Sequence, residues 1–249
     1  MCFDSDSEPP IQRIVGAAVS HDDLTLTSAD GTELAAFLAT PDDAATTGVV
    51  ILPDVRGLYH FYEELALRFA ERGHAAIAID YFGRTAGAAK RSEDFEYMPH
   101  VEQTTDAQVQ ADAAAGVAKL RELGVASVFT VGFCFGGRAS WVAAASGHGL
   151  AGAVGFYGSP TRERGGASPV ARVRQIGCAI LALQAGADPN ITAEDNAAFD
   201  EALTGAGVEH EIVSYDGAPH SFFDRKQEEF QADSDDAWRR TLEFIAAHA

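Results

Sequence analysis

Short apolar runs alternate with longer amphipathic stretches along the sequence, and this alternation most restricts what the chain can fold into. Continuous apolar runs occupy residues 48–53, 75–80, 127–133, 150–157 and 179–184, and another strand is predicted at 209–215. Unbroken apolar runs of this length are typical of strands that are covered on both faces. Helical periodicity is found between and after them, from about 58 to a C-cap at Gly73 and at about 104–122, 136–146, 192–206 and 234–247. The pattern predicts an α/β fold with a mostly parallel, doubly wound sheet.

The first part of the chain has a different pattern, which predicts an N-terminal β-hairpin. Residues 24–27 and 34–38 flank the pair Asp30-Gly31, which is typical of a hairpin turn. Residues 1–20 are predicted to be an irregular lead-in, and residues 81–103 are polar and irregular. No internal repeat or linker divides the 249 residues, so we expect one domain over 1–249.

The charge balance and the absence of certain motifs exclude several classes of function. The chain has 37 acidic and 18 basic side chains and a formal net charge of -19, which disfavours nucleic-acid and membrane partners. Neither a signal peptide nor a spanning segment is evident, so a cytoplasmic location is expected. The eight histidines include no HExxH pair, and no GxGxxG or P-loop follows the first parallel strand. We therefore expect no metal and no cofactor; the sequence gives no indication of oligomeric state.

Cys134 lies in Gly132-Phe-Cys-Phe-Gly136-Gly, where a predicted buried strand meets a small-residue helix. A sharp strand-to-helix turn strains the backbone of a nucleophile, and flanking glycines avoid the clash that results. The helix N-terminus also favours a thiolate. The alternative is a small buried core cysteine, which is how we interpret Cys178, while Cys2 belongs to the tail. The surrounding motif favours Cys134 as a nucleophile.

Two further residues follow Cys134 in the order that such a nucleophile requires. Asp188 comes directly after the predicted strand 179–184, and His220 follows the predicted strand 209–215. Taken singly, an Asp before a proline is usually a turn residue, and a lone histidine is usually a surface residue. The order nucleophile, acid, histidine, with each at a strand end, predicts a catalytic triad.

With these motifs, the chain resembles the dienelactone hydrolase family of α/β hydrolases, which use a Cys-His-Asp triad. The resemblance extends over nearly the whole chain and includes Gly-Phe-Cys134-Phe-Gly-Gly, Val154-Gly-Phe-Tyr-Gly158, Ala-Gly-Ala-Asp188 and Pro-His220-Ser-Phe. It implies a single-domain α/β-hydrolase fold with Cys134 as nucleophile, His220 as base and Asp188 as the orienting acid. By analogy with other α/β hydrolases, the oxyanion hole is expected to consist of the backbone N–H groups of Val55 and Phe135.

The resemblance also assigns a role to Asp54, in the loop after the first central strand. Family members place an acidic residue there that meets the resting thiol, so Asp54 is expected to modulate the nucleophile. The best-known members have Glu, which is one methylene longer. A carboxylate that only supports a turn or a helix start is the alternative for Asp54.

The same family members hold a substrate carboxylate with two arginines. Candidates for this role in or near the predicted active-site loops are Arg56, Arg84, Arg91, Arg138 and Arg225. Each is equally compatible with an ordinary surface cation.

Together, these residues predict a cysteine-dependent hydrolase of lactones or esters, of the dienelactone or carboxymethylenebutenolide type, that works through a thioester acyl-enzyme. A broad-specificity carboxylesterase or thioesterase on the same fold is one alternative. A non-catalytic binding protein with an α/β-hydrolase-like fold is the other, but a binder has no need of His220 and Asp188 together.

Overall fold

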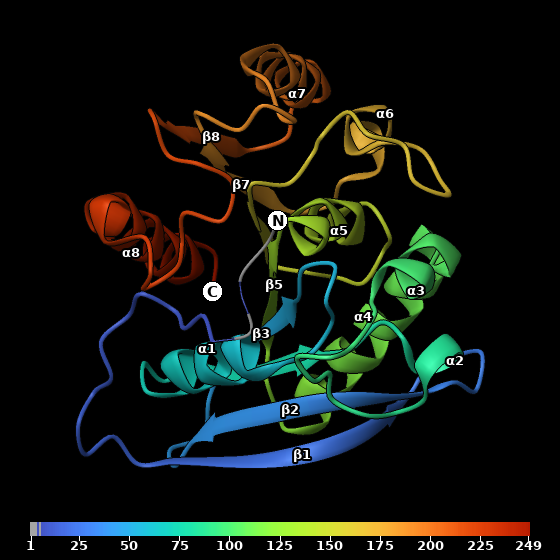
Figure 1. The fold of residues 1–249 in the computed structure, drawn as a ribbon, viewed down its shortest axis with the longest axis vertical. Helices are drawn as coiled ribbons and strands as arrows, with labels where there is room; N and C mark the ends of the chain where they lie inside the picture. The colour runs from blue at the N-terminus through green and yellow to red at the C-terminus, as the bar shows by residue number, and fades with distance from the viewer. Residues whose placement is uncertain (1–3, 5) are drawn as a thin grey trace.

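An eight-stranded sheet runs through the middle of the computed structural model, which describes residues 4 and 6–249 (Figure 1). The strands are β1 (Val19–Thr27), β2 (Glu33–Pro41), β3 (Thr47–Leu52), β4 (Ala75–Ile79), β5 (Ser127–Phe133), β6 (Gly152–Phe156), β7 (Ala179–Ala185) and β8 (His210–Tyr215). Their order in the sheet is β1-β2-β4-β3-β5-β6-β7-β8. Both β1–β2 and β2–β4 pair antiparallel, and every other pair is parallel. The predicted mostly parallel α/β sheet is confirmed.

The N-terminal hairpin forms around the predicted turn and is longer than expected. Gly31 has φ +83°, and the Ser28 N–H donates to the Thr32 carbonyl at 2.8 Å, which closes the turn. In the register, Thr27 lies opposite Glu33 and Val19 opposite Pro41. The predicted irregular lead-in 1–20 is therefore too long by two residues, since β1 begins at Val19.

Helices cover both faces of the sheet. Core residues of α1 (His60–Ala70) and α8 (Gln231–His248) pack on one face, and those of α4 (Asp106–Glu122), α5 (Phe135–Ala144) and α7 (Ala193–Ala206) pack on the other. The short helices are α2 (Gly83–Ala86), α3 (Met98–Gln103), α6 (Pro169–Arg172), η1 (Val173–Gln175) and η2 (Glu228–Phe230). The expectation of an irregular segment at 81–103 was wrong in part, because α2 and α3 lie there. Within the described part of the chain, no helix combines the length and apolar character needed to cross a bilayer.

Strand β3 illustrates why apolar runs became central strands. Val49 and Ile51 belong to the core on the α1 side, whereas Val50 and Leu52 belong to the core on the α4 side. All four side chains are fully buried. Successive strand residues point to opposite faces, so a strand between two helical layers needs apolar residues at every position.

The parallel arrangement also brings several loops to one edge of the sheet. The carboxyl ends of β3, β5, β6, β7 and β8 lead into the segments that hold Asp54, Cys134, Tyr157, Asp188 and His220. In open α/β sheets this edge is where ligands bind.

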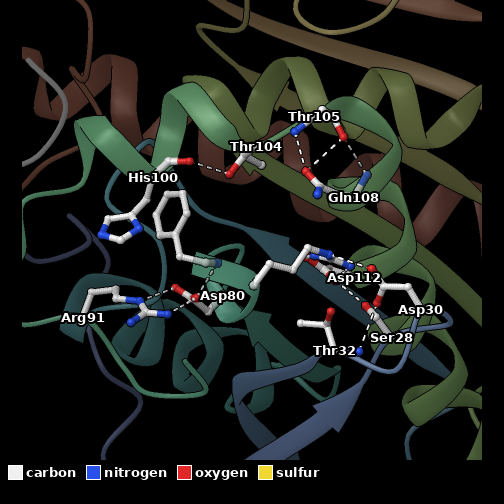
Figure 2. A network of polar contacts seen from close by, with 12 residues as sticks. Ser28, Asp30, Thr32, Asp80, Arg91, His100, Thr104, Thr105, Gln108 and Asp112 are labelled. Carbon is white, nitrogen blue, oxygen red and sulfur yellow. Dashed lines mark hydrogen bonds and ion pairs between the residues drawn. The ribbon is translucent and has the colours of Figure 1, made fainter. Parts of the chain in front are cut away.

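The buried carboxylate of Asp80 organises the long loop that follows β4 (Figure 2). It accepts hydrogen bonds from Arg91 Nε at 3.0 Å and Nη2 at 2.6 Å, and from the backbone N–H groups of Leu58 and Phe82. Arg91 is itself buried and donates to the Gly87 carbonyl at 2.8 Å. The pair therefore joins the β4 loop to the segment that enters α1.

Removing the cation of this pair should be costly, because the Asp80 carboxylate would stay buried without its charged partner. We expect Arg91→Gln to lower the free energy of unfolding by about 3–5 kcal/mol. The neighbouring Lys90→Gln, which breaks partly exposed pairs with Asp23 and Glu63, should cost less than about 1 kcal/mol. Urea denaturation of both variants checks this; equal losses would contradict the burial argument.

Candidate active site

Cys134 occupies a strained turn between β5 and α5. Its backbone has φ 55° and ψ -112°, and its N–H donates to the Phe156 carbonyl at 2.9 Å. A Cβ at Gly132 would lie 1.9 Å from the Gly136 carbonyl oxygen, and one at Gly136 would lie 2.0 Å from the Leu52 carbonyl oxygen. Only glycine fits at these two positions. The turn thus has the features of a nucleophile elbow, in which a residue held at positive φ presents its side chain above the sheet.

His220 and Asp188 form the second part of the site. His220 Nδ1 lies 2.5 Å from Asp188 Oδ2, and Asp188 Oδ1 accepts the Asn190 N–H at 2.9 Å. Burial of the Asp188 carboxylate raises its pKa, but the hydrogen bonds from His220 and Asn190 outweigh burial and hold that pKa below its usual value. An ionised Asp188 favours the histidine tautomer with its proton on Nδ1, which leaves Nε2 as the basic atom.

Tyr157 lies beside this histidine at the end of β6. It has φ 36°, which is unusual for a residue with a bulky side chain. Its ring centroid is 4.9 Å from that of His220, and its N–H donates to the Leu183 carbonyl at 2.8 Å. The strained backbone therefore places an aromatic ring against the imidazole.

Cys134 and His220 line the same cavity, whose volume is ≈ 350 Å³. The other lining residues are Val55, Phe135, Arg138, Tyr157, Ser159, Arg162, Arg164, Asn190 and Ile191. The two predicted oxyanion residues, Val55 and Phe135, are thus both present. Phe135 is the first residue of α5, so its N–H has no acceptor within the helix. Over residues 4 and 6–249, no three His, Cys, Asp or Glu side chains gather as metal ligands.

Asp54 is fully buried at the base of the loop that carries Val55. Its carboxylate accepts the Arg56 N–H at 2.8 Å and the Tyr59 hydroxyl at 3.3 Å, while its own N–H donates to the Tyr62 hydroxyl at 2.8 Å. Burial raises the pKa of Asp54 to about 6, although these contacts and the Arg56 charge oppose the rise. Asp54 therefore supports the loop that presents Val55 to the cavity.

Three of the arginines proposed from the sequence lie outside this cavity, because carboxylates elsewhere hold them. Arg84 pairs with the buried Asp112 at 2.8 Å, and Arg91 pairs with Asp80 (Figure 2). Arg225 forms an ion pair with Glu8. Their closeness to active-site loops in the sequence did not predict which way their side chains point.

The other two proposed arginines are close to the cavity but differ in environment. Arg138 lines it, yet its guanidinium is buried and makes a two-point ion pair with Asp106, at 2.6 and 3.0 Å. Arg56 lines a neighbouring cavity of ≈ 280 Å³, with its guanidinium carbon 5.8 Å from the Tyr59 ring centroid.

Sequence reasoning missed Arg162 and Arg164, which do line the Cys134 cavity. The guanidinium carbon of Arg164 lies 4.6 Å from the Phe135 ring centroid, and its Nη2 donates to the Val101 carbonyl. Burial lowers the pKa of Arg164, and no carboxylate of the described residues lies within ion-pair distance of it. Both residues belong to an irregular segment without periodicity, so only the presence of two arginines in the tripeptide Arg162-Glu163-Arg164 could have indicated them.

With this geometry in place, comparison with known proteins identifies the family. Residues 34–249 match the Dienelactone hydrolase family. The chain belongs to the dienelactone hydrolase family. It is accordingly an α/β hydrolase that acts on ester or lactone bonds, as the sequence predicted.

Individual relatives agree with this assignment. A carboxymethylenebutenolidase of Rhodococcus opacus is 28% identical over 263 residues, covering 98% of this chain and 96% of the relative. A Yersinia pestis protein assigned as a carboxymethylenebutenolidase is 29% identical over 92% of this chain and 89% of its own length. Among solved structures, a Klebsiella pneumoniae protein assigned as a dienelactone hydrolase superposes with a TM-score of 0.82 at 26% identity, covering 92% of this chain and 99% of that one.

The buried Asp54 predicts a distinctive pH dependence of stability. Its pKa is about 6 in the folded protein and 3.8 as the ordinary value, so between these pH values the folded chain holds a proton that the unfolded chain has lost. This extra proton stabilises the folded chain at low pH. As the pH rises from about 4 to about 6 that stabilisation is lost, which lowers the free energy of unfolding by up to about 3 kcal/mol.

Asp54→Asn should abolish that component, because the amide keeps the shape and one of the two acceptor oxygens but does not titrate. Urea denaturation of the variant and the wild type between about pH 4 and pH 7 measures the difference. Asp22→Asn, an exposed position on β1, serves as the control. Parallel stability curves for wild type and Asp54→Asn would show that the carboxylate titrates normally.

Proposed function

We propose that the chain hydrolyses ester or lactone substrates with Cys134 as the nucleophile, through a thioester acyl-enzyme. The observation that supports this most is a cysteine at a strained strand–helix turn that shares one cavity with a histidine bonded to a buried aspartate. A non-catalytic binding site has no need of backbone strain at Cys134.

The first half-reaction forms the acyl-enzyme. His220 Nε2 takes the proton from the Cys134 thiol, and the sulfur forms a bond to the substrate carbonyl carbon. The carbonyl oxygen becomes an oxyanion that accepts hydrogen bonds from the N–H groups of Val55 and Phe135. The carbon–oxygen bond to the leaving alkoxide then breaks, and His220 returns its proton to that oxygen.

The second half-reaction releases the acid. His220 Nε2 takes a proton from a water molecule, whose oxygen attacks the thioester carbonyl. The carbon–sulfur bond breaks, the carboxylic acid leaves and the thiol recovers the proton. For a lactone, the alcohol and the acid are parts of one product molecule, because the ring oxygen is the leaving group.

In this proposal Asp54 moderates the reactivity of Cys134, which is the role that the family resemblance assigns to an acidic residue at this position. Its buried carboxylate supports the loop of Val55, and Val55 lines the same cavity as Cys134. In Asp54→Asn, alkylation of Cys134 by iodoacetamide is expected to be faster and turnover slower than in the wild type. An unchanged alkylation rate would leave Asp54 with the supporting role described above and no other.

The favoured substrates carry an anionic group near the scissile ester. Arg164 supports this preference, because it is a partly buried cation that lines the cavity and stacks on Phe135 without a carboxylate partner in the described chain. Arg162 adds a second positive charge to the same wall. A substrate carboxylate would supply the missing counter-charge.

Cys134→Ala should remove turnover while the fold is retained. A p-nitrophenyl ester should give a burst of p-nitrophenol with the wild type, and the variant should lose the burst and about 10³-fold or more of kcat. Cys178→Ala is the control, since burial raises the pKa of that thiol to about 11 and it lies outside the cavity. Retention of more than about a tenth of the activity by Cys134→Ala would overturn the nucleophile assignment.

Arg164→Gln should change specificity more than catalysis. We expect kcat/KM for mono-p-nitrophenyl glutarate to fall about 10-fold or more, and kcat/KM for the neutral p-nitrophenyl pentanoate to change less than about 2-fold. Measuring both esters at low and high salt separates the direct contact from long-range attraction. Equal effects on the two esters would remove Arg164 from substrate recognition.

A further inference from the structure

Asp106 and Arg138 form a buried ion pair between α4 and the helix that carries the nucleophile. Arg138 lies four residues after Cys134 on α5, and its backbone N–H donates to the Cys134 carbonyl at 3.2 Å. Both side chains of the pair are more than nine-tenths buried. Asp106 is in the first turn of α4, which a capping box between Thr105 and Gln108 fixes (Figure 2).

Arg138 also donates hydrogen bonds to the irregular segment between β6 and α6. Nε donates to the Arg162 carbonyl at 2.9 Å, and Nη2 approaches the Ala167 carbonyl at 3.5 Å. Arg172 adds a second link, since its Nε donates to the Ala167 carbonyl at 2.9 Å and its Nη2 lies 3.4 Å from Asp106 Oδ2. One carboxylate thus holds two guanidinium groups, and these hold two carbonyls of the segment.

The packing around this network is close. A Cβ at Gly166 would lie 2.6 Å from Arg172 Nη2 and 2.9 Å from Asp106 Oδ2, so the backbone passes directly over the charged groups. Because residue 166 is a glycine, the segment can come close to the buried carboxylate of Asp106. A side chain at this position would push the segment away from it.

The segment held in this way carries part of the cavity wall. Ser159, Arg162 and Arg164 line the Cys134 cavity, and all three lie in the stretch between β6 and α6. That stretch has no regular secondary structure before α6, so its course depends on side-chain contacts. The links to Arg138 therefore fix the position of this wall relative to the nucleophile helix.

We propose that Asp106, acting through Arg138, is a positioning residue that sets the specificity of the enzyme by holding the 159–168 segment, and with it Arg162 and Arg164, against the cavity. This inference rests on the proposed function. It assigns Arg138 a supporting role and not contact with the substrate, since its guanidinium is already committed to Asp106 and to the two carbonyls.

The decisive variant is Asp106→Asn, with Asp112→Asn as a matched control. Asp112 lies on the same helix, is buried and makes a two-point ion pair with Arg84, but Arg84, unlike Arg138, does not line the cavity. In Asp106→Asn we expect KM for mono-p-nitrophenyl glutarate to rise about 10-fold, while kcat and KM for p-nitrophenyl pentanoate stay within about 2-fold of the wild type. Asp112→Asn should leave the ratio between the two esters unchanged.

A second measurement tests the clamp without using activity. Trypsin cleaves after arginine, and Arg162 and Arg164 both lie in the segment that is held. Under native conditions, cleavage at these two positions should be about 10-fold or more faster in Asp106→Asn than in the wild type or Asp112→Asn, as followed by mass spectrometry. If the wild type hydrolyses neither ester, the proposed function fails, whereas the proteolysis still decides whether the clamp exists.

Arg138→Lys covers the case in which Asp106→Asn does not fold. A lysine can pair with Asp106, but it lacks the planar fork that also reaches the segment. We expect the same faster cleavage and the same shift in ester preference. The inference is overturned if trypsin cleaves a folded Asp106→Asn or Arg138→Lys variant at the wild-type rate, or if the substitution changes the hydrolysis of both esters equally. It is also overturned if Asp112→Asn produces the same change in ester preference.

Discussion

The close approach of backbone segments around Cys134 is the constraint on which the rest of the site depends. The turn from β5 into α5 passes so near the end of β3 that Gly136 has no room for a side chain, and it folds back so closely on itself that Gly132 has none either. Cys134 is thereby held at positive φ, and its N–H donates to the Phe156 carbonyl at the end of β6. The end of β3, the turn at Cys134 and the strand that leads to Tyr157 are therefore packed together as one unit.

Buried carboxylates decide where most of the arginines near the site are directed. Asp80, Asp106 and Asp112 are each buried in a place where an unpaired charge would be costly, and each binds an arginine at two points. These pairs hold loops in place and leave fewer cations for the cavity. Of the three arginines that line the cavity, Arg138 is paired with Asp106, whereas Arg162 and Arg164 form no ion pair among the described residues.

The predicted triad and the predicted arginines differ in how well the sequence could locate them. Cys134, Asp188 and His220 each follow a strand directly, and parallel strands bring their ends to a common edge, so a linear pattern was enough to gather them. Arg84 and Arg91 also come after a strand, but they lie within the long loop that follows β4, and their side chains are long and flexible. Their direction depends on partners far away in the sequence, such as Asp112 for Arg84.

The sequence by itself determined the layered fold, because each central strand must be apolar on both faces and each covering helix must carry an apolar stripe. It also indicated the sharp turn at Cys134, since glycines on both sides of a residue at a strand–helix junction allow a close approach of backbone that other residues would block. Only the tertiary structure decided which cations line the cavity and that Arg138 binds both Asp106 and the Arg162 carbonyl. Those outcomes depend on contacts between residues distant in the chain, in segments such as 159–168 where no periodic pattern specifies the path of the backbone.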